Sequence, residues 1–324
     1  MKCNYLFLLS FLLLSSSGYS VAQTAASYPA RPIRVIVPYP PGGSTDIIAR
    51  TINGKLAALL KQQLVIDNRG GGGGNLGHEL AARATPDGYT LLIAISAIIT
   101  NAAINPRTTY DPTRDFTPLM MIARAPYRLV INPGVPANTM QEFIALAKAK
   151  PGSMNYGSAG AGSAVHLAAE LLLRQTGVQM THVPYKGSGP AIVDLIAGQI
   201  QMVLGGTLST APQTKAGRVR ALAVTSLKRR ADAPDLPTIN ETVAPGYEAA
   251  EWFAVFAPAG VPKPIVDKLH AELIKAANDT DVKDRLIASG MDFVGSTPAE
   301  LADTVKRDYA KWSRLIKETG LKVD

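Results

Sequence analysis

The sequence contains almost no cysteine: Cys3 is the single thiol among 324 residues. It lies before the first apolar run instead of after it, so it is not placed to carry a lipid at a new N-terminus. We expect Cys3 to be removed with a signal peptide, which leaves a mature protein without disulfides or thiolate chemistry. A chain of this length buries enough apolar surface to fold without such cross-links.

Long apolar runs are missing beyond residue 22. Residues 5–14 are apolar, but they are about half the roughly 20 residues that a membrane helix needs, which argues against an uncleaved anchor. Lys2 precedes this run, and Ser20-Val21-Ala22 places small residues where signal peptides are cleaved. We therefore predict that residues 1–22 are a cleaved signal peptide, that the protein is exported to the periplasm, and that it has no stable membrane insertion.

Concentrated charge is missing as well. The chain has 33 Lys and Arg against 25 Asp and Glu, a formal net charge of +8, which weakly favours anionic partners. The basic residues are spread along the chain and are not interleaved with aromatic residues, so nucleic acid is not an expected partner. The histidines at positions 78, 166, 182 and 270 lack the spacing of metal ligands. We predict neither a metal nor a cofactor.

Catalytic motifs are also absent. No serine has glycine both two residues before and two residues after it, as a nucleophile elbow requires; Ser158 comes nearest, with Gly160 but also Tyr156 at these positions. Residues 72–77 match the dinucleotide fingerprint literally, but no acidic residue follows about 20 positions later. We predict that the protein is not an enzyme, and a secreted enzyme acting on a small acid stays an alternative.

What the chain does contain is a regular alternation of short β-branched runs and amphipathic segments. Residues 33–37 read as a buried strand, and apolar residues at helical spacing follow from position 48 to 60. A second series begins at residue 128, and three helices follow a strand at residues 252–257. This pattern predicts an α/β fold in which mixed, mostly parallel sheets are flanked by helices. We expect a first lobe of residues 23–127 plus 249–324, interrupted by a second lobe of residues 128–248.

Capping residues mark several of the expected helix starts. Thr139-x-x-Glu142 and Thr297-x-x-Glu300 are capping boxes, in which a hydroxyl and a carboxylate satisfy free N–H groups of the first turn. Ser163 can cap the helix that follows a glycine-rich turn.

Four loops share one design, in which a strand ends, a turn rich in Gly, Ser and Thr follows, and in most cases a helix begins. They are residues 40–46, 95–100, 157–163 and 205–210. In open α/β sheets ligands lie beyond the carboxyl ends of strands, where helix N-termini present free N–H groups. These loops contain no Lys or Arg, so they predict an anion that is held mainly by backbone amides and hydroxyls. The alternative is that each hydroxyl merely caps its own helix.

Several motifs together resemble one known family over essentially the whole chain after the signal peptide. They are residues 38–46, 68–74, 86–91, 156–160, 183–187, 190–195 and 257–262. In order and spacing they are similar to the Bug-type receptors of tripartite tricarboxylate transporters. The resemblance implies a monomeric, two-lobed Venus-flytrap solute-binding protein with the periplasmic-binding-protein fold. It also implies a small carboxylate ligand in the cleft between the lobes, and membrane permease subunits or a sensor protein as partners.

The same resemblance implies a set of ligand contacts at the matching positions. In the first lobe these are Gly42, Gly43, Ser44, Thr45 and Ser96, and in the second lobe Ser158, Ala159, Gly162, Ser163 and His166, with Lys186 and Thr207 near the rim. For His166 the sequence leaves two roles open, a neutral hydrogen-bonding group near the ligand or simple packing. Delivery to a permease and signalling through a sensor without transport also stay open, because both need the same closed state.

Overall fold

The computed structural model describes residues 28–185, 187–288 and 290–321, apart from the side chain of Leu208. The predicted signal peptide and Lys186 lie outside these residues. The described chain forms one mixed sheet with the strand order β2-β1-β3-β9-β4-β7-β5-β6, and β8 and β10 both pair with β4. Within the described residues, no helix combines the length and the apolar character that a membrane crossing requires.

The elements alternate along the chain as the sequence predicts. Before the second series they are β1 (Ile33–Val37), α1 (Ser44–Leu60), β2 (Leu64–Asn68), the 3-10 turn η1 (Gly72–Gly74), α2 (Asn75–Ala82), β3 (Thr90–Ile95), α3 (Ala97–Ile104) and β4 (Phe116–Ile131). Then follow α4 (Met140–Ala149), β5 (Asn155–Ser158), α5 (Ala164–Thr176), β6 (Thr181–Pro184), α6 (Ser188–Ile196), β7 (Met202–Gly206), α7 (Thr207–Lys215), β8 (Arg220–Val224) and α8 (Ile239–Thr242). The last elements are β9 (Ala250–Pro258), α9 (Lys263–Ala277), α10 (Thr280–Ala288), β10 (Asp292–Phe293) and α11 (Pro298–Thr319).

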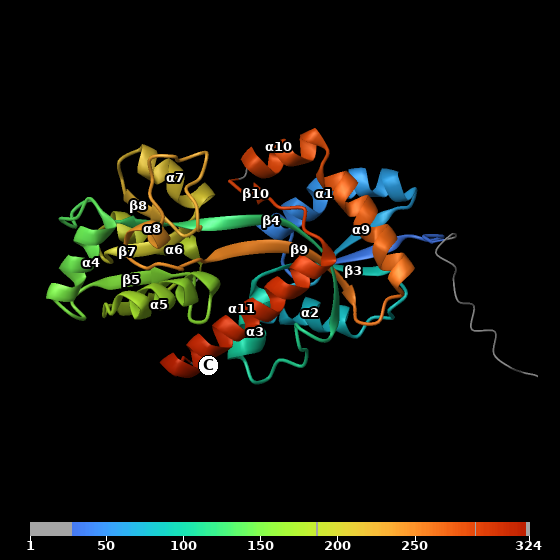
Figure 1. The fold of residues 1–324 in the computed structure, drawn as a ribbon, viewed down its shortest axis with the longest axis horizontal. Helices are drawn as coiled ribbons and strands as arrows, with labels where there is room; N and C mark the ends of the chain where they lie inside the picture. The colour runs from blue at the N-terminus through green and yellow to red at the C-terminus, as the bar shows by residue number, and fades with distance from the viewer. Residues whose placement is uncertain (1–27, 186, 289, 322–324) are drawn as a thin grey trace, which may run out of the picture.

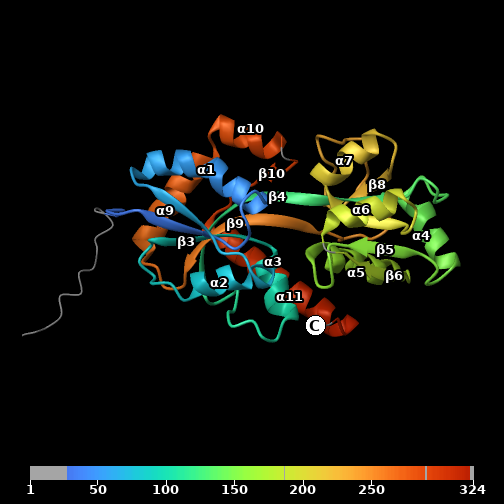
Figure 2. The same ribbon diagram turned by 180° about the vertical axis from the view of Figure 1, so that it is seen from behind.

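The strands divide the molecule into two halves, which lie side by side along its longest axis (Figures 1 and 2). The first half contains β1, β2, β3, β9 and β10, with α1–α3 and α9–α11; the second contains β5–β8 with α4–α8. Residues 116–126 of β4 pair with β9 in the first half, and residues 127–131 pair with β7 and β8 in the second. The halves are therefore joined through the sheet itself, at the segment where β4 crosses.

The direction of the strands follows from this connection. β1, β2 and β3 pair in parallel, and so do β5, β6 and β7, because a helix lies between each pair of successive strands. Every antiparallel pair within the described sheet includes β4 or β9. The predicted lobe boundaries, between residues 127 and 128 and between residues 248 and 249, fall inside β4 and just before β9.

The predicted caps are present at the helix starts. The Thr297 hydroxyl accepts a hydrogen bond from the Glu300 N–H, and the Glu300 carboxylate accepts one from the Thr297 N–H, which completes the capping box of α11. The Thr139 hydroxyl accepts from the Glu142 N–H at the start of α4, but the Glu142 carboxylate accepts from the Asn138 N–H and not from that of Thr139, so only half of this predicted capping box forms. Such caps contribute about 1 kcal/mol each.

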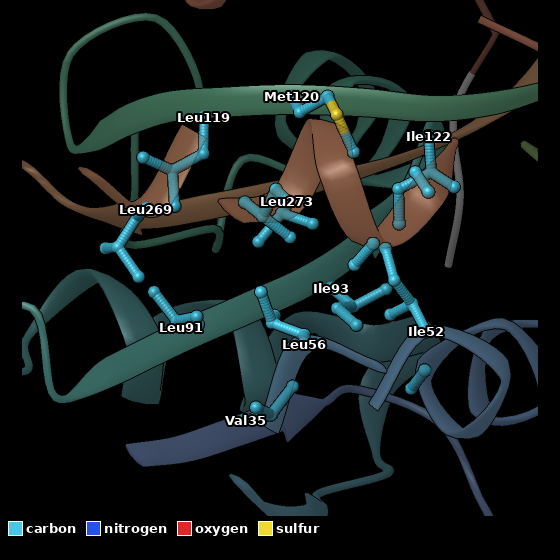
Figure 3. Close-up of a cluster of buried hydrophobic side chains, with 14 of the residues drawn as sticks. Val35, Ile52, Leu56, Leu91, Ile93, Leu119, Met120, Ile122, Leu269 and Leu273 are labelled. Carbon is cyan, nitrogen blue, oxygen red and sulfur yellow. The ribbon is translucent and has the colours of Figure 1, made fainter. Parts of the chain in front are cut away.

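Each half has its own apolar core on both faces of the sheet. In the first half, α1 and α9 cover one face, and Ile52, Leu56, Leu269 and Leu273 pack against strand residues such as Val35, Leu91 and Ile93 (Figure 3). Fully burying one such side chain contributes about 1.5–3 kcal/mol. The other face packs against α3 and α11, and two further clusters fill the second half. Leu167 and Leu171 of α5 belong to the same cluster as α3 and α11, so the two halves also pack against each other on this face.

Candidate functional site

A cleft of about 570 Å³ lies between the two halves. This volume falls within the roughly 300–1,000 Å³ of typical small-molecule sites. The first half contributes Tyr39, Gly72, Gly73, Asn75, Ile95, Ala97, Thr100, Asn101, Ile104, Asn105 and Glu251 to its wall. The second half contributes Tyr127, Ala159, Ala161, Gly162, Ser163, Ala164, Val165, Ser188, Gly206 and Ser209.

Helix starts from both halves meet at this wall. Ala97 begins α3, Ala164 begins α5, Ser188 begins α6, and Gly206 is the N-cap residue of α7. The first N–H groups of a helix have no acceptor within the helix and carry the positive end of its dipole. Among the described residues, the cleft wall contains no lysine or arginine. The wall therefore favours a negatively charged group through main-chain donors.

The glycine loop between β5 and α5 is held in one conformation by its own hydrogen bonds. Gly160 and Gly162 have φ angles of +127° and +76°, which side chains larger than hydrogen rarely adopt. The Ser163 hydroxyl donates to the Gly160 carbonyl (2.7 Å) and accepts from the His166 N–H (3.3 Å). Ser163 is thus the N-cap of α5, and the free donors of this helix belong to Ala164 and Val165.

His166 supports this loop from behind. Its Nδ1 accepts a hydrogen bond from the Gly162 N–H (2.9 Å), and its ring stacks on that of His182. Burial, and then the neighbouring His182, lower the pKa of His166 to about 4, so the ring is neutral near pH 7. His166 is buried and does not line the cleft. Of the two roles that the sequence left open, the geometry corresponds to packing and loop support.

Ser158 lies at the end of β5, behind the same loop. Its Oγ is 2.6 Å from His182 Nε2 and donates to the Gly160 carbonyl. The serine is buried, and neither Ser158 nor His182 belongs to the cleft wall. The pair therefore stabilises the turn and does not present a nucleophile to the cleft.

None of the four predicted contacts in the first loop belongs to the cleft wall. Gly42, Gly43 and Ser44 are exposed, and Thr45 is buried in α1. The Gly42 N–H already donates to the Asp46 carboxylate (2.9 Å), whose pKa is lowered to about 2 chiefly by a hydrogen bond from Arg50. An anion at this amide would meet the negative charge of Asp46.

Two other predicted contacts carry hydroxyls without a partner in the described structure. Ser96 Oγ and Thr207 Oγ1 are both buried and make no hydrogen bond within the described residues. Ser96 precedes α3, next to Ala97 in the cleft wall. Thr207 instead packs against Gly290. Of the described predicted residues, Ala159, Gly162 and Ser163 line the cleft directly.

The glycine tract forms one edge of the cleft. Asn101 Nδ2 and the Tyr39 hydroxyl both donate to the Gly73 carbonyl, at 2.8 and 3.3 Å. Gly73 and its neighbours have positive φ angles, and a Cβ on Gly74 would lie 2.9 Å from the Tyr39 hydroxyl. Sequence reasoning identified the tract but not the roles of Tyr39, from the loop after β1, or Asn101, from α3.

Glu251 is the charged residue that the sequence analysis missed. It lies near the start of β9 and lines the cleft beside Tyr39 and Tyr127, whose pKa values its charge raises further. Burial raises the pKa of the Glu251 carboxyl to about 7. The available signal was an acidic residue directly before an apolar segment, residues 252–258. No group of His, Cys, Asp and Glu that could hold a metal is found in the described part of the chain.

Two α/β halves around a ligand-sized cleft define a two-lobed binding protein. The chain belongs to the TctC family, described as "Tripartite tricarboxylate transporter family receptor", whose sequence model matches residues 48–321. Protein BugT of Bordetella pertussis is 34% identical over 314 residues, which are 96% of this chain and 96% of BugT. The resemblance to Bug-type receptors is thereby confirmed.

Solved structures agree with this assignment. "R. palustris Rpa4515 with adipate" is 36% identical with a TM-score of 0.77, and the match covers 91% of this chain and 99% of that one. "MatC (Rpa3494) from Rhodopseudomonas palustris with bound malate" is 32% identical with a TM-score of 0.74, covering 89% and 100%. The predicted two-lobed periplasmic-binding-protein fold is confirmed.

Proposed function

We propose that this protein is a periplasmic solute-binding receptor that captures a small organic carboxylate in the cleft. The carboxylate bridges a first lobe of residues 23–127 plus 249–324 and a second lobe of residues 128–248. The closed, monomeric receptor then delivers the ligand to a tripartite tricarboxylate-type permease. Family membership, and the adipate and malate in the two related structures, support a carboxylate as the ligand.

The observation that carries the proposal is the meeting of uncharged helix starts in a cleft whose described wall holds no lysine or arginine. A hydrogen bond to a charged group contributes about 1.5–3 kcal/mol. Micromolar affinity corresponds to about −8.2 kcal/mol, so roughly three to five such bonds are needed before the costs of binding are counted. The starts of α3, α5, α6 and α7 can together supply this number.

We place the strongest contact with the carboxylate at the start of α5, through the N–H groups of Ala164 and Val165. Both residues line the cleft at the positive end of a helix of 13 residues. Ala159, Gly162 and Ser163 shape this pocket, and Ala97 at the start of α3 lines it from the opposite half, next to the buried Ser96.

A thermal-shift screen of mono-, di- and tricarboxylates tests the proposal. A ligand at about 100 times its Kd adds roughly 2.7 kcal/mol to the free energy of unfolding, so the melting temperature rises measurably. Unchanged melting with every member of the panel contradicts carboxylate capture. Titration calorimetry on the hits then gives Kd and stoichiometry, with one ligand per chain expected.

Closure of the lobes and transport are tested separately. A ligand that bridges the halves stabilises the closed form through its differential contacts, so small-angle scattering should show a smaller radius of gyration with ligand. Uptake of the labelled ligand by cells that express receptor and permease, compared with cells lacking the receptor, distinguishes transport from signalling alone.

A further inference from the structure

Glu251 is an unusual residue to find in a cleft built for an anion. An ionised carboxylate there repels a second carboxylate, and at about 4 Å this repulsion is on the order of 4 kcal/mol in partly buried surroundings. The described residues provide no compensation, because no hydrogen bond or ion pair to Glu251 is found among them. As far as the described part of the chain goes, Glu251 is left to interact with a ligand or with solvent.

Glu251 and the start of α5 line the cleft from opposite halves. Glu251 lies on β9, beside the segment where the sheet connects the halves, and it is the register partner of Ala125 on β4. The start of α3 is close to Glu251, because the Ser96 N–H donates to the carbonyl of the next residue, Trp252 (3.1 Å). Ala164 and Val165 come from the second half, at the start of α5. A ligand that spans the cleft from α5 to β9 therefore has its carboxylate at one half and its second group beside Glu251 at the other.

We propose that Glu251 determines ligand specificity by binding a protonated nitrogen, so that the preferred ligand is a small carboxylate that also carries an amino group. This inference rests on carboxylate capture in the same cleft. The two charges of such a zwitterion match two features of the cleft wall, the free N–H groups at the start of α5 in one half and, in the other, a carboxyl group without an ionic partner among the described residues. A bound ammonium group pairs with the negative charge of Glu251, whereas a dicarboxylate of the same length places a second negative charge beside it.

The aromatic neighbours of Glu251 fit the same class of ligand. Tyr39 and Tyr127 lie close enough for the Glu251 charge to raise their pKa values, and both also line the cleft. The face of an aromatic ring attracts a cation but not a carboxylate. A protonated nitrogen at this end therefore gains both from the rings and from the Glu251 carboxylate. The two phenols remain neutral near pH 7, so Glu251 is the acidic charge at this end of the cleft wall.

The test compares ligands that share one end. 5-Aminovalerate, adipate and hexanoate have the same carboxylate and four methylene groups, and end in an ammonium, a carboxylate and a methyl group. The same comparison is made with shorter and longer members of each series, matched by their number of methylene groups. Titration calorimetry at pH 8 measures Kd for the wild-type protein and for Glu251→Gln, which keeps the shape and removes the charge.

We expect amino-carboxylates to bind the wild-type protein at least about tenfold more tightly than the matching dicarboxylates, a difference of about 1.4 kcal/mol. Glu251→Gln should lower the affinity for amino-carboxylates about tenfold or more, and leave or raise that for dicarboxylates. Glu248→Gln is the matched control, because Glu248 lies three residues earlier but pairs with Arg124 (2.8 Å) outside the cleft wall. Thermal melts without ligand establish that each variant is folded.

The outcomes separate the two proposals. Tighter binding of dicarboxylates by the wild-type protein, or an unchanged preference in Glu251→Gln, overturns the role of Glu251 and leaves carboxylate capture standing. Failure of every carboxylate in the panel to bind overturns carboxylate capture and this inference with it.

Discussion

The rings of His166 and His182 lie stacked, with centroids 3.8 Å apart and an interplanar angle of 10°. Burial disfavours the charge on each ring, and for His166 the neighbouring His182 disfavours it further. The pKa values of both histidines are accordingly lowered, and that of His166 falls to about 4. Because neutral His166 accepts the Gly162 N–H bond, the cleft loop depends on the uncharged form of this pair.

The first prediction concerns stability in acid. The pKa of His166 is about 4 in the folded protein, below its model value of 6.5, so the unfolded chain binds more protons between these values. The stabilisation is therefore complete above pH 6.5 and is lost as the pH falls toward 4, by up to about 3 kcal/mol. Thermal melts from pH 8 to 4 should show a steeper loss for the wild-type protein than for His166→Gln. His270→Gln, on α9, is the control, and equal slopes in all three proteins contradict the prediction.

The second prediction concerns the left-handed glycine in the cleft loop. Gly162→Ala forces a side chain into a φ of +76°, which costs about 1–2 kcal/mol or moves the loop. We expect ligand affinity to fall about tenfold, because the start of α5 moves with the loop. Gly152→Ala is the matched control: its φ is +72° and no atom lies within 4 Å of the added Cβ, in a turn outside the cleft wall. We expect the two variants to lose similar stability, but Gly162→Ala to lose much more ligand affinity than Gly152→Ala. Equal losses of affinity would refute this role of the loop.

The third prediction tests a single main-chain donor. Proline is tolerated at the first position of a helix, and Ser163 has the ψ of 156° that a residue before proline prefers. Ala164→Pro therefore removes one N–H group from the cleft while α5 stays intact. Losing one hydrogen bond to a charged ligand should weaken binding by about 1.5–3 kcal/mol, or roughly 10- to 150-fold.

Ser44→Pro is the comparison for this variant, because Ser44 is the first residue of α1 and lies in the loop that the family resemblance implicates. Calorimetry on both variants determines which helix start holds the carboxylate. The geometry predicts the larger loss for Ala164→Pro. A larger loss for Ser44→Pro would move the carboxylate to the first loop.

The fold was predictable from the sequence where local patterns decide it. The caps at Thr139 and Thr297 and the strand at residues 33–37 depend on neighbouring residues alone, and each is present. The full length of β4 was not predicted. Pro118 and Pro126 interrupt its pattern, since proline cannot donate to a sheet ladder, and the register shifts after Pro118.

The site was predictable only in part, for a related reason. The loop at residues 157–163 was identified from the sequence. Which of its groups can donate a hydrogen bond to a ligand depends on which hydroxyls already bond within the protein, and the Ser163 hydroxyl caps its own helix. The wall at Tyr39 and Glu251 depends on how β9 and the first loop approach the second half. Such contacts join residues more than 200 positions apart, and no periodicity in the chain records them.

The last prediction uses the pKa of Glu251, which burial raises from 4.5 to about 7. Between these values the folded protein binds more protons than the unfolded chain, so the protein without ligand loses stability as the pH rises toward 7. Glu251→Gln should remove this loss and raise the free energy of unfolding above pH 7 by an amount on the order of 1–3 kcal/mol, which appears as a higher melting temperature. Melts of both proteins at pH 5 and pH 8 measure the difference, and a variant that is less stable at pH 8 would contradict it.

Ligand binding should depend on the same titration, with opposite signs for two classes of ligand. An amino-carboxylate binds ionised Glu251, so its affinity should fall as the pH drops through 7, whereas a dicarboxylate is repelled less once Glu251 carries a proton. The other titratable groups beside Glu251, Tyr39 and Tyr127, stay neutral throughout, and His166 titrates at about 4, so a change centred near pH 7 belongs to Glu251. Calorimetric titrations from pH 5.5 to 8.5 should show this dependence in the wild-type protein and a flat profile in Glu251→Gln. A profile that is flat in both proteins would mean that the carboxyl does not face the bound ligand.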